Sequence, residues 1–124
     1  MNLFRRIPWQ GVWTAAMILT RGLAEMTRLG MASCIVTNGT LLTPERARRL
    51  HDAGMRTVSV SIDGLEVEHE TVRGQGSYGK ALAGIAAARQ AGMVDVEAIT
   101  CVRGANLHQL PEIERVVRQA GANL

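Results

Sequence analysis

Cysteine is scarce in this sequence of 124 residues, and its scarcity excludes two classes of protein. The two cysteines, Cys34 and Cys101, are too few for a disulfide framework and too far apart in sequence for a local metal knuckle. Both lie inside apolar runs. This cysteine usage favours a reducing compartment, so we expect a cytoplasmic protein.

The sequence also lacks a block of like charge and an apolar run of membrane-spanning length. Thirteen of the 14 basic residues are arginines, scattered from Arg5 to Arg118, and the net charge is only +3, which gives nucleic-acid binding little support. Residues 12–19 follow Arg5 and Arg6 as in a short signal peptide, but no clear small-residue cleavage site comes after them. They also make up only about half of the roughly 20 residues that a membrane-spanning helix needs. We therefore expect neither a nucleic acid nor a membrane as partner.

The composition is that of one folded domain. Hydrophobic residues make up 47% and charged residues 20% of the chain, which is typical of a globular protein and not of a disordered one. Single hydrophobic cores usually belong to chains of about 100 to 200 residues, so this length allows one domain or a piece of one.

Glycine divides the chain into alternating helical and strand-like segments. Gly30, Gly54, Gly92 and Gly121 each follow a helical pattern, and after the first three comes a run rich in Val, Ile and Thr. The pattern predicts helices over residues 13–29, 44–53, 78–91 and 110–120, and strands over residues 32–37, 57–62 and 94–102.

The order of these segments predicts an α/β fold. Strands that are separated by helices pair in parallel through right-handed crossovers, with the helices packed on the sheet. Three strands are too few to close a barrel, and so small a parallel sheet has exposed edges. Because the chain stops just after Gly121, where a fourth strand should begin, we expect it to be a fragment of a larger domain.

Polar residues gather where the predicted strands end, which is the edge at which parallel α/β proteins bind ligands. Thr37 and Asn38 lie at the end of the first strand, Ser61 and Asp63 at the end of the second, and residues 100–106 at the end of the third. Because side chains alternate along a strand, Ser61 and Asp63 share one face, and Val58, Val60 and Ile62 share the other. Asn-Gly and Asp-Gly are also ordinary turn formers, so this pattern by itself leaves a structural role open.

Two further motifs lie before the third predicted helix. Residues 73–77 (RGQGS) resemble a glycine-rich phosphate loop that opens a helix, but they lack the Walker lysine and do not directly follow a strand. His69 lies in a charged stretch that we expect to be a loop, where a single histidine is usually solvated. Neither motif alone specifies a function.

Taken together and in order, the motifs resemble the radical S-adenosylmethionine (radical SAM) enzymes. The residues that carry the likeness are 36–42 (VTNGTLL), 60–64 (VSIDG), His69, Arg73-Gly74, Gly76-Ser77, and Val102 with Asn106 and Leu107. The likeness covers residues 22–124. It is to the middle of the family's partial (βα)6 barrel, in members with a cysteine-rich, SPASM-type extension. Residues 1–21, predicted to be an irregular leader and the start of the first helix, resemble nothing in the family.

The resemblance implies a role for each polar strand-end residue. The three predicted strands would be the third, fourth and fifth of the barrel, with Thr37 and Asn38 facing the adenosylmethionine pocket. Ser61 would hydrogen-bond the ribose or the aminoacyl part of the cofactor, and Arg73 would pair with its carboxylate, which a guanidinium fork holds through two parallel bonds. Asp63 would lie at the rim and shape the turn, and Arg103 would face solvent.

The resemblance also implies a reaction. Intact family members use an electron from a [4Fe-4S] cluster to cleave S-adenosylmethionine into methionine and a 5′-deoxyadenosyl radical, in peptide modification or cofactor biosynthesis. The expected partners are this small-molecule cofactor and either a peptide substrate or the missing remainder of the domain. The Cys-x3-Cys-x2-Cys cluster loop and the Gly-Gly-Glu-Pro run are absent from the sequence. We therefore expect a catalytically incomplete fragment that carries no cluster.

Two alternatives remain open at this point. The chain could be a non-catalytic α/β module that binds a partner protein through an exposed sheet edge. It could also be a domain that binds a phosphate ligand through the loop of residues 74–77, although this loop lies away from the strand ends.

Overall fold

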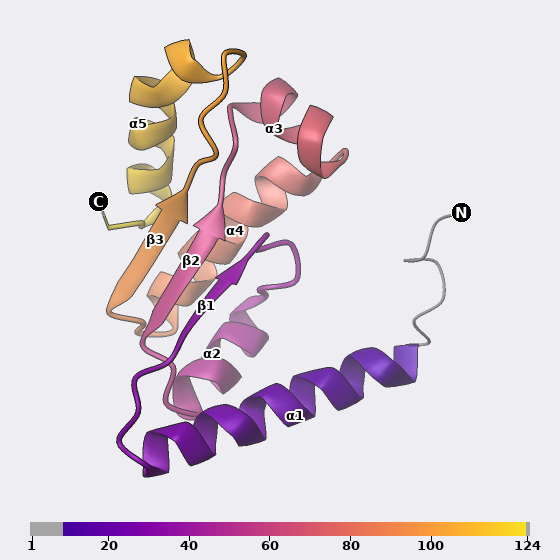
Figure 1. The fold of residues 1–124 in the computed structure, drawn as a ribbon, viewed down its shortest axis with the longest axis vertical. Coiled ribbons are helices and arrows are strands. Elements are labelled where there is room, and N and C mark those ends of the chain that lie inside the picture. The colour runs from indigo at the N-terminus through magenta and orange to yellow at the C-terminus, as the bar shows by residue number, and fades with distance from the viewer. Residues whose placement is uncertain (1–8, 124) are drawn as a thin grey trace.

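The computed structural model describes residues 9–123, with side chains from residue 19 onward, and its centre is a three-stranded sheet (Figure 1). Strand β1 is Cys34–Thr37, β2 is Thr57–Ser61 and β3 is Asp95–Ile99. They lie in the order β1-β2-β3, and both neighbouring pairs run parallel. The parallel α/β class that the sequence predicts is confirmed.

The helices of the described chain are α1 (Trp9–Arg28), α2 (Pro44–Asp52), α3 (Glu66–Arg73), α4 (Ser77–Gln90), the 3₁₀ helix η2 (Leu107–Gln109) and α5 (Leu110–Ala120). Four of them correspond to the four predicted helices, although α1 begins four residues before its predicted start. Local chemistry sets the start of α2, where the Thr43 hydroxyl accepts a hydrogen bond from the backbone N–H of Arg46 at 3.3 Å. Pro44 follows in the first turn, where a missing N–H costs nothing.

Helix α3 corrects the prediction of a charged loop between β2 and the next helix. Its two valines, Val67 and Val72, are 72% and 50% exposed, so the apolar residues of this helix point to solvent. The buried side chain is that of His69. The sequence therefore shows no apolar stripe with helical spacing here, which is the signal on which a helix prediction rests.

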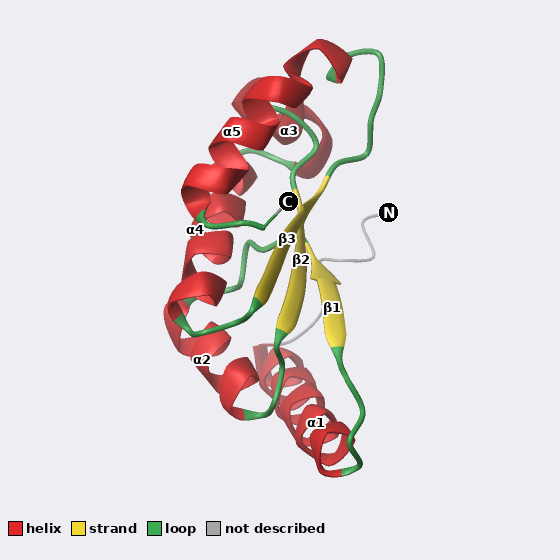
Figure 2. Ribbon diagram, turned by 90° about the vertical axis from the view of Figure 1, so that its left-hand side faces the viewer, coloured by secondary structure: helices red, strands yellow, loops and turns green. Residues whose placement is uncertain are grey.

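The helices α2, α4 and α5 cover one face of the sheet, and the other face stays open within the described part of the chain (Figure 2). The covered face forms the core. Val58 and Val60 of β2 and Val96 of β3 pack there with Ala81 and Ile85 of α4, and all five are 0% exposed. The predicted alternation along β2 is confirmed by these valines, whose side chains turn to the helices.

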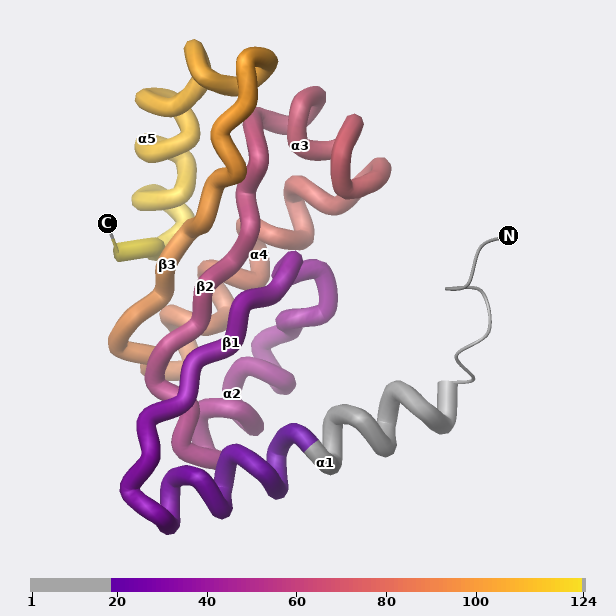
Figure 3. Tube along the Cα trace, viewed as in Figure 1, coloured from indigo at the N-terminus to yellow at the C-terminus, as the bar shows by residue number. Residues whose placement is uncertain are grey.

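Helix α1 lies across the end of the sheet at which the strands begin, next to α2, and the chain turns from it into β1 (Figure 3). The Thr27 hydroxyl donates a hydrogen bond to the carbonyl of Ala53, just after α2, at 3.1 Å. Among the described residues, no helix is both long and apolar enough to cross a membrane.

A close contact between two glycines sets the distance between α4 and the loop that follows β1. A Cβ atom added to Gly84 of α4 would lie 2.7 Å from the carbonyl oxygen of Gly39, which is shorter than any ordinary contact. Gly39 itself has φ +73° and would place a Cβ 2.7 Å from the side chain of Val60. Glycine at both positions therefore lets α4 pack directly on the Thr37-Asn38-Gly39 segment.

We predict that Gly84→Ala lowers the free energy of unfolding by about 1 to 3 kcal/mol, because the new methyl group overpacks a rigid backbone contact. Gly79→Ala is the matched control, since it lies in the same helix with no heavy atom within 4 Å of its added Cβ. Gly79→Ala should raise the free energy of unfolding by about 0.5 to 1 kcal/mol, because alanine favours a helix interior more than glycine does. Urea unfolding of wild type and the two variants measures both effects. If the free energy of unfolding changes in the same direction in both variants, the predicted role of the Gly84 contact is contradicted.

Candidate functional site

The polar residues that the sequence singled out converge at the carboxyl ends of β2 and β3. Asp63 lies at their centre, two residues beyond the end of β2, and is only 3% exposed. Helix α3 follows it in the chain, and the loop between β3 and η2 packs against it from the other side. We refer to Asp63 and its four bonded neighbours, His69, Arg73, Cys101 and Asn106, as the Asp63 cluster.

Each backbone and side-chain polar atom of Asp63 has a partner. One carboxylate oxygen accepts a hydrogen bond from the backbone N–H of Cys101 at 2.9 Å, and the other accepts one from Nε of Arg73 at 2.6 Å. The carbonyl oxygen accepts from the side-chain amide of Asn106 at 2.7 Å, and the backbone N–H donates to Nδ1 of His69 at 3.1 Å. A buried carboxylate requires this degree of satisfaction to remain charged.

Asp63, which the sequence analysis placed at the rim of the cofactor site, is buried beneath the loops that it holds. Burial by itself raises the pKa of the Asp63 carboxyl, but the N–H of Cys101 and the guanidinium of Arg73 outweigh that effect. The pKa therefore lies below its ordinary value of 3.8, and the group is charged at neutral pH.

Arg73 is the last residue of α3, and it folds back over the end of β2. Its Nε contacts Asp63, while its two terminal nitrogens have no hydrogen-bond partner among the described residues. The side chain is 30% exposed, against 5% for that of Asp63. Asp63 therefore orients the guanidinium by one edge and leaves the other edge available to a ligand.

Asn106 is a residue of the cluster to which the sequence analysis gave no role. It is fully buried, and its side-chain amide donates to the carbonyl of Cys101 at 3.0 Å as well as to that of Asp63. Its side-chain oxygen accepts from the backbone N–H of Arg103 at 2.7 Å. The only sequence signal for Asn106 was its membership in the family motif, because its partners lie in two separate segments.

His69 and Arg103 also differ from expectation. His69 is not solvated but 0% exposed, with its ring 5.6 Å from that of Tyr78 in an edge-on arrangement. Arg103 is half-buried, and its guanidinium approaches the carbonyl of Asp63 at 3.5 Å instead of facing solvent. The partner of Arg103 lies 40 residues away, which the sequence pattern does not reveal, whereas His69 was misjudged because its segment was expected to be a loop and is a helix.

The three other predicted binding residues lie on different sides of the sheet. Ser61 ends β2 on the open face; it is 8% exposed, and its hydroxyl makes no hydrogen bond with any described residue. Thr37 lies beside Val60 on the helix-covered side, and its hydroxyl accepts from the backbone N–H of Gly39 at 3.2 Å. Asn38 is exposed, with its side-chain oxygen bonded to Thr40. Ser61 and Arg73 thus have free donors, whereas the oxygens of Thr37 and Asn38 are already engaged.

The open face of the sheet is polar in its middle. The Ser59 hydroxyl donates to a carboxylate oxygen of Glu97 at 2.6 Å, and the Cys34 sulfur lies 3.9 Å from the same hydroxyl. Cys34 is on β1 and Cys101 follows β3, so β2 separates the two thiols. No cluster of three or more metal-ligating side chains occurs among the residues that the structure describes.

The glycine-rich loop before α4 is held by the chain's own groups. The Ser77 hydroxyl donates to the carbonyl of Gly74 at 2.6 Å, and a carboxylate oxygen of Glu70 lies 3.4 Å from the backbone N–H of Tyr78. A carboxylate at the first turn of α4 occupies the place that a phosphate ligand would need. This geometry weighs against the phosphate-binding alternative.

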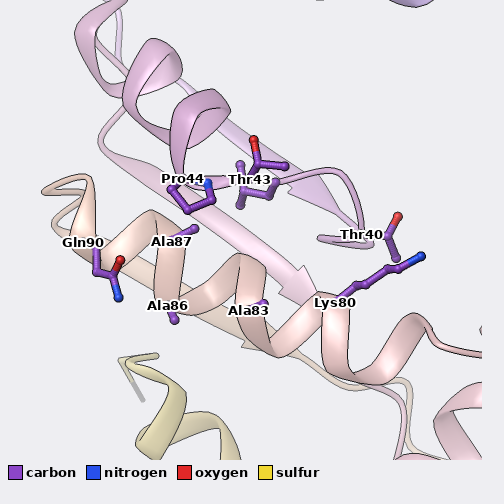
Figure 4. A pocket seen from close by; sticks show the side chains of 9 residues that line it. Thr40, Thr43, Pro44, Lys80, Ala83, Ala86, Ala87 and Gln90 are labelled. Atoms are coloured by element: carbon purple, nitrogen blue, oxygen red, sulfur yellow. The ribbon is translucent and has the colours of Figure 1, made fainter.

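A groove lies apart from the Asp63 cluster, between the start of α2 and the outer side of α4 (Figure 4). Its lining side chains are short and mostly apolar, and Lys80 is the only charged one among them. They are Thr40, Leu42, Thr43, Pro44, Lys80, Ala83, Ala86, Ala87 and Gln90. The groove offers few polar groups to a ligand, so the Asp63 cluster remains the candidate site.

We predict that Asp63→Asn lowers the free energy of unfolding by about 1 to 3 kcal/mol at neutral pH, because it removes a charged hydrogen-bond acceptor from a buried site. The pKa of Asp63 is depressed in the folded state, so the wild-type stabilisation is present above pH 3.8 and is lost as the pH falls below that value. Acid unfolding should therefore be shallower in the variant. Asp52→Asn, at a side chain that is 71% exposed, serves as control, and parallel acid curves for Asp63→Asn and wild type would contradict the prediction.

Comparison with known proteins identifies the family. The model of the radical SAM superfamily matches residues 14–117. AdoMet-dependent heme synthase of Methanosarcina barkeri is 38% identical over 98 residues, which are 77% of this chain and 28% of that protein. Mycofactocin maturase MftC of Mycolicibacterium smegmatis is 34% identical over 71% of this chain and 23% of its own length. GTP 3′,8-cyclase 1 of Mycobacterium tuberculosis is 37% identical over 73% of this chain and 25% of its own.

The chain spans only about a quarter of the length of these relatives. Within that span the match includes both strand ends that form the Asp63 cluster, together with Ser61 and the segment after β1. The family model covers most of the sequence and the whole of the candidate site, and on that basis this chain belongs to the radical SAM superfamily.

Proposed function

We propose that this chain supplies the part of a radical SAM enzyme that binds the methionine end of S-adenosylmethionine. The observation that carries the proposal is the arrangement at the end of β2. Asp63 holds Arg73 by Nε alone, and the unpartnered hydroxyl of Ser61 lies two residues away on the same strand end. A guanidinium edge with two free donors matches a carboxylate in two parallel hydrogen bonds.

The residues present fit this cofactor. Arg73 would hold its carboxylate, and Ser61 would donate to its ribose or aminoacyl part from the open face of the sheet. The exposed side-chain amide of Asn38, together with Thr37, would close the site from the end of β1. When bound, adenosylmethionine supplies the radical chemistry of the family, and the residues of this chain bind and orient it.

The same residues do not fit the iron-sulfur cluster. Three thiolates are needed to bind a [4Fe-4S] cluster with one iron left open, and this sequence contains Cys34 and Cys101 only. Cys34 lies on β1 and Cys101 follows β3, so β2 separates the two thiols. We therefore propose that the sequence is catalytically incomplete by itself and needs cluster-binding cysteines from elsewhere.

The names of the relatives support a role in cofactor biosynthesis or peptide modification, because they include a heme synthase and a mycofactocin maturase. The names also differ from one another, so the shared segment does not define the substrate. We also propose that the described sheet is part of the family's partial barrel, in a member with a SPASM-type extension. A reducing, cytoplasmic location is consistent with two free cysteines.

A second candidate function is protein binding through the outer edge of β1. This strand is at the edge of the sheet, and no described strand pairs with its far side. An unpaired edge is a template for a further strand, whether it comes from the rest of a barrel or from a partner protein. Folding that requires an added polypeptide would support this candidate.

We predict that Arg73→Lys weakens adenosylmethionine binding by about 1 to 3 kcal/mol, in a chimera that joins this chain to the cluster-binding segment of a relative. Lysine keeps the charge but loses the planar fork that contacts Asp63 and a ligand carboxylate together. Calorimetric titration measures the loss.

The control for this variant is Arg48→Lys, since Arg48 is exposed on α2 and makes no hydrogen bond with the described residues. Arg103 is unsuitable, because its guanidinium already approaches Asp63. Equal affinities of the Arg73 and Arg48 variants would remove Arg73 from the cofactor site.

We also predict that the 124-residue chain binds no [4Fe-4S] cluster when it is reconstituted anaerobically with iron and sulfide, because two separated thiols cannot hold it. Iron and sulfide analysis and absorption spectra of the monomer provide the measurement. A stoichiometric cluster on the monomer would show that cluster binding does not depend on the missing cysteine loop.

A further inference from the structure

His69 is a fully buried titratable side chain to which the proposed function assigns no part. It lies in the middle of α3, is 0% exposed, and accepts the backbone N–H of Asp63 through Nδ1 at 3.1 Å. Its second ring nitrogen, Nε2, is also buried and has no hydrogen-bond partner among the described residues. A buried ring nitrogen without a hydrogen-bond partner destabilises the fold, so its presence calls for an explanation.

The spacing along α3 links His69 to the proposed ligand site. His69 and Arg73 are four residues apart, so they lie on the same face of the helix. Both contact Asp63 from that face: His69 holds its backbone N–H, and Arg73 holds its carboxylate. The backbone and the side chain of Asp63 are thus fixed by two successive turns of one helix.

The start of α3 is fixed as well. The side-chain oxygen of Gln109 accepts the backbone N–H of Leu65 at 2.9 Å, and a Cβ added to Gly64 would lie 2.6 Å from the Cβ of Glu68. The helix therefore packs closely on the turn after Asp63, with little freedom to shift. If the hydrogen bond from Asp63 to His69 breaks, Asp63 and its bonded partners must therefore move, because the helix cannot.

The contact requires a neutral ring. Nδ1 accepts a hydrogen bond, so the single proton of the neutral imidazole is on Nε2. Protonation would add a proton to Nδ1 and place two donors, the ring N–H and the backbone N–H of Asp63, against each other. The bond cannot persist in the protonated state.

We propose that His69 is a positioning residue for Arg73. The neutral imidazole holds the backbone N–H of Asp63, which sets the direction of the Asp63 carboxylate and thereby the guanidinium edge that is offered to a ligand carboxylate. Protonation of His69 releases this arrangement. The part that concerns the ligand rests on the proposed function, whereas the link between His69 and Asp63 does not.

The charges around His69 define the pH range of this switch. Burial lowers the pKa of His69, and the guanidinium of Arg73 on the same helix lowers it further, while Asp63 and Glu70 act in the opposite direction. Tyr78 of α4 covers the ring from the other side. Because the pKa lies below its ordinary value of 6.5, the bond is intact at pH 7 and is lost only as the pH falls through this lowered pKa.

Two substitutions separate hydrogen bonding from packing. His69→Asn can place an amide oxygen where Nδ1 lies, whereas His69→Gln is closer to histidine in size but places its amide near the position of Nε2. If His69 acts through its hydrogen bond, the asparagine variant should stay closer to wild type. If it acts through packing, the glutamine variant should stay closer. The measurements are hydrogen exchange of the Asp63 amide by NMR and calorimetric binding of S-adenosylmethionine, both from pH 7.5 to pH 5.

For wild type we expect the protection of the Asp63 amide, corrected for intrinsic exchange, to fall about tenfold as the pH falls through the pKa of His69, which NMR titration of the ring locates. The glutamine variant should show about tenfold less protection at pH 7.5 and about tenfold weaker adenosylmethionine binding. The asparagine variant should keep both properties close to wild type and independent of pH.

Equal behaviour of the two variants, or wild-type protection that does not change with pH while the fold persists, would overturn the inference. If neither variant folds, the wild-type pH series still decides. If the Asp63 amide behaves as expected but wild type binds no adenosylmethionine, the proposed function fails and the link between His69 and Asp63 stands.

Discussion

The Asp63 carboxylate joins the end of β2 and helix α3, which follow one another in the chain, to the loop after β3, which lies 38 residues further on. A buried carboxylate without partners would be protonated or would expel the loops around it. Here Arg73 and the N–H of Cys101 satisfy its two oxygens, and their combined effect keeps its pKa low despite burial. The positions of helix α3 and of the loop after β3 therefore depend on the negative charge of Asp63.

This arrangement uses one donor of Arg73 for structure and leaves the others to the ligand that we propose. A guanidinium has five N–H donors in a rigid plane, and the single bond through Nε fixes the direction of the other four. A lysine in the same place would have to choose between Asp63 and a ligand. The buried carboxylate thus gives an exposed cation a defined orientation, which a flexible side chain at a strand end would otherwise lack.

The two faces of the sheet differ in polarity. The covered face is apolar and packs Val58 and Val60 against α4, whereas the open face is polar around Ser59 and ends at the unpartnered hydroxyl of Ser61. The strand alternation turns the side chain of Thr37 to the helices, so its part in the proposed site stays a prediction.

The sequence by itself determined the parallel strands, the helices α2, α4 and α5, and the family, because these depend on local periodicity, on glycine after helices and on motifs of adjacent residues. Only the tertiary structure decided that His69 is buried, that Asn106 braces the site and that Asp63 is its centre. The bonds that make them so join residues up to 43 positions apart. Helix α3 was missed for a different reason, since its inward face is held by the polar contacts of His69 and Arg73 with Asp63 and carries no apolar stripe. A hydrogen bond between distant segments leaves no periodic trace in the sequence, and it exists only once the sheet has brought the strand ends together.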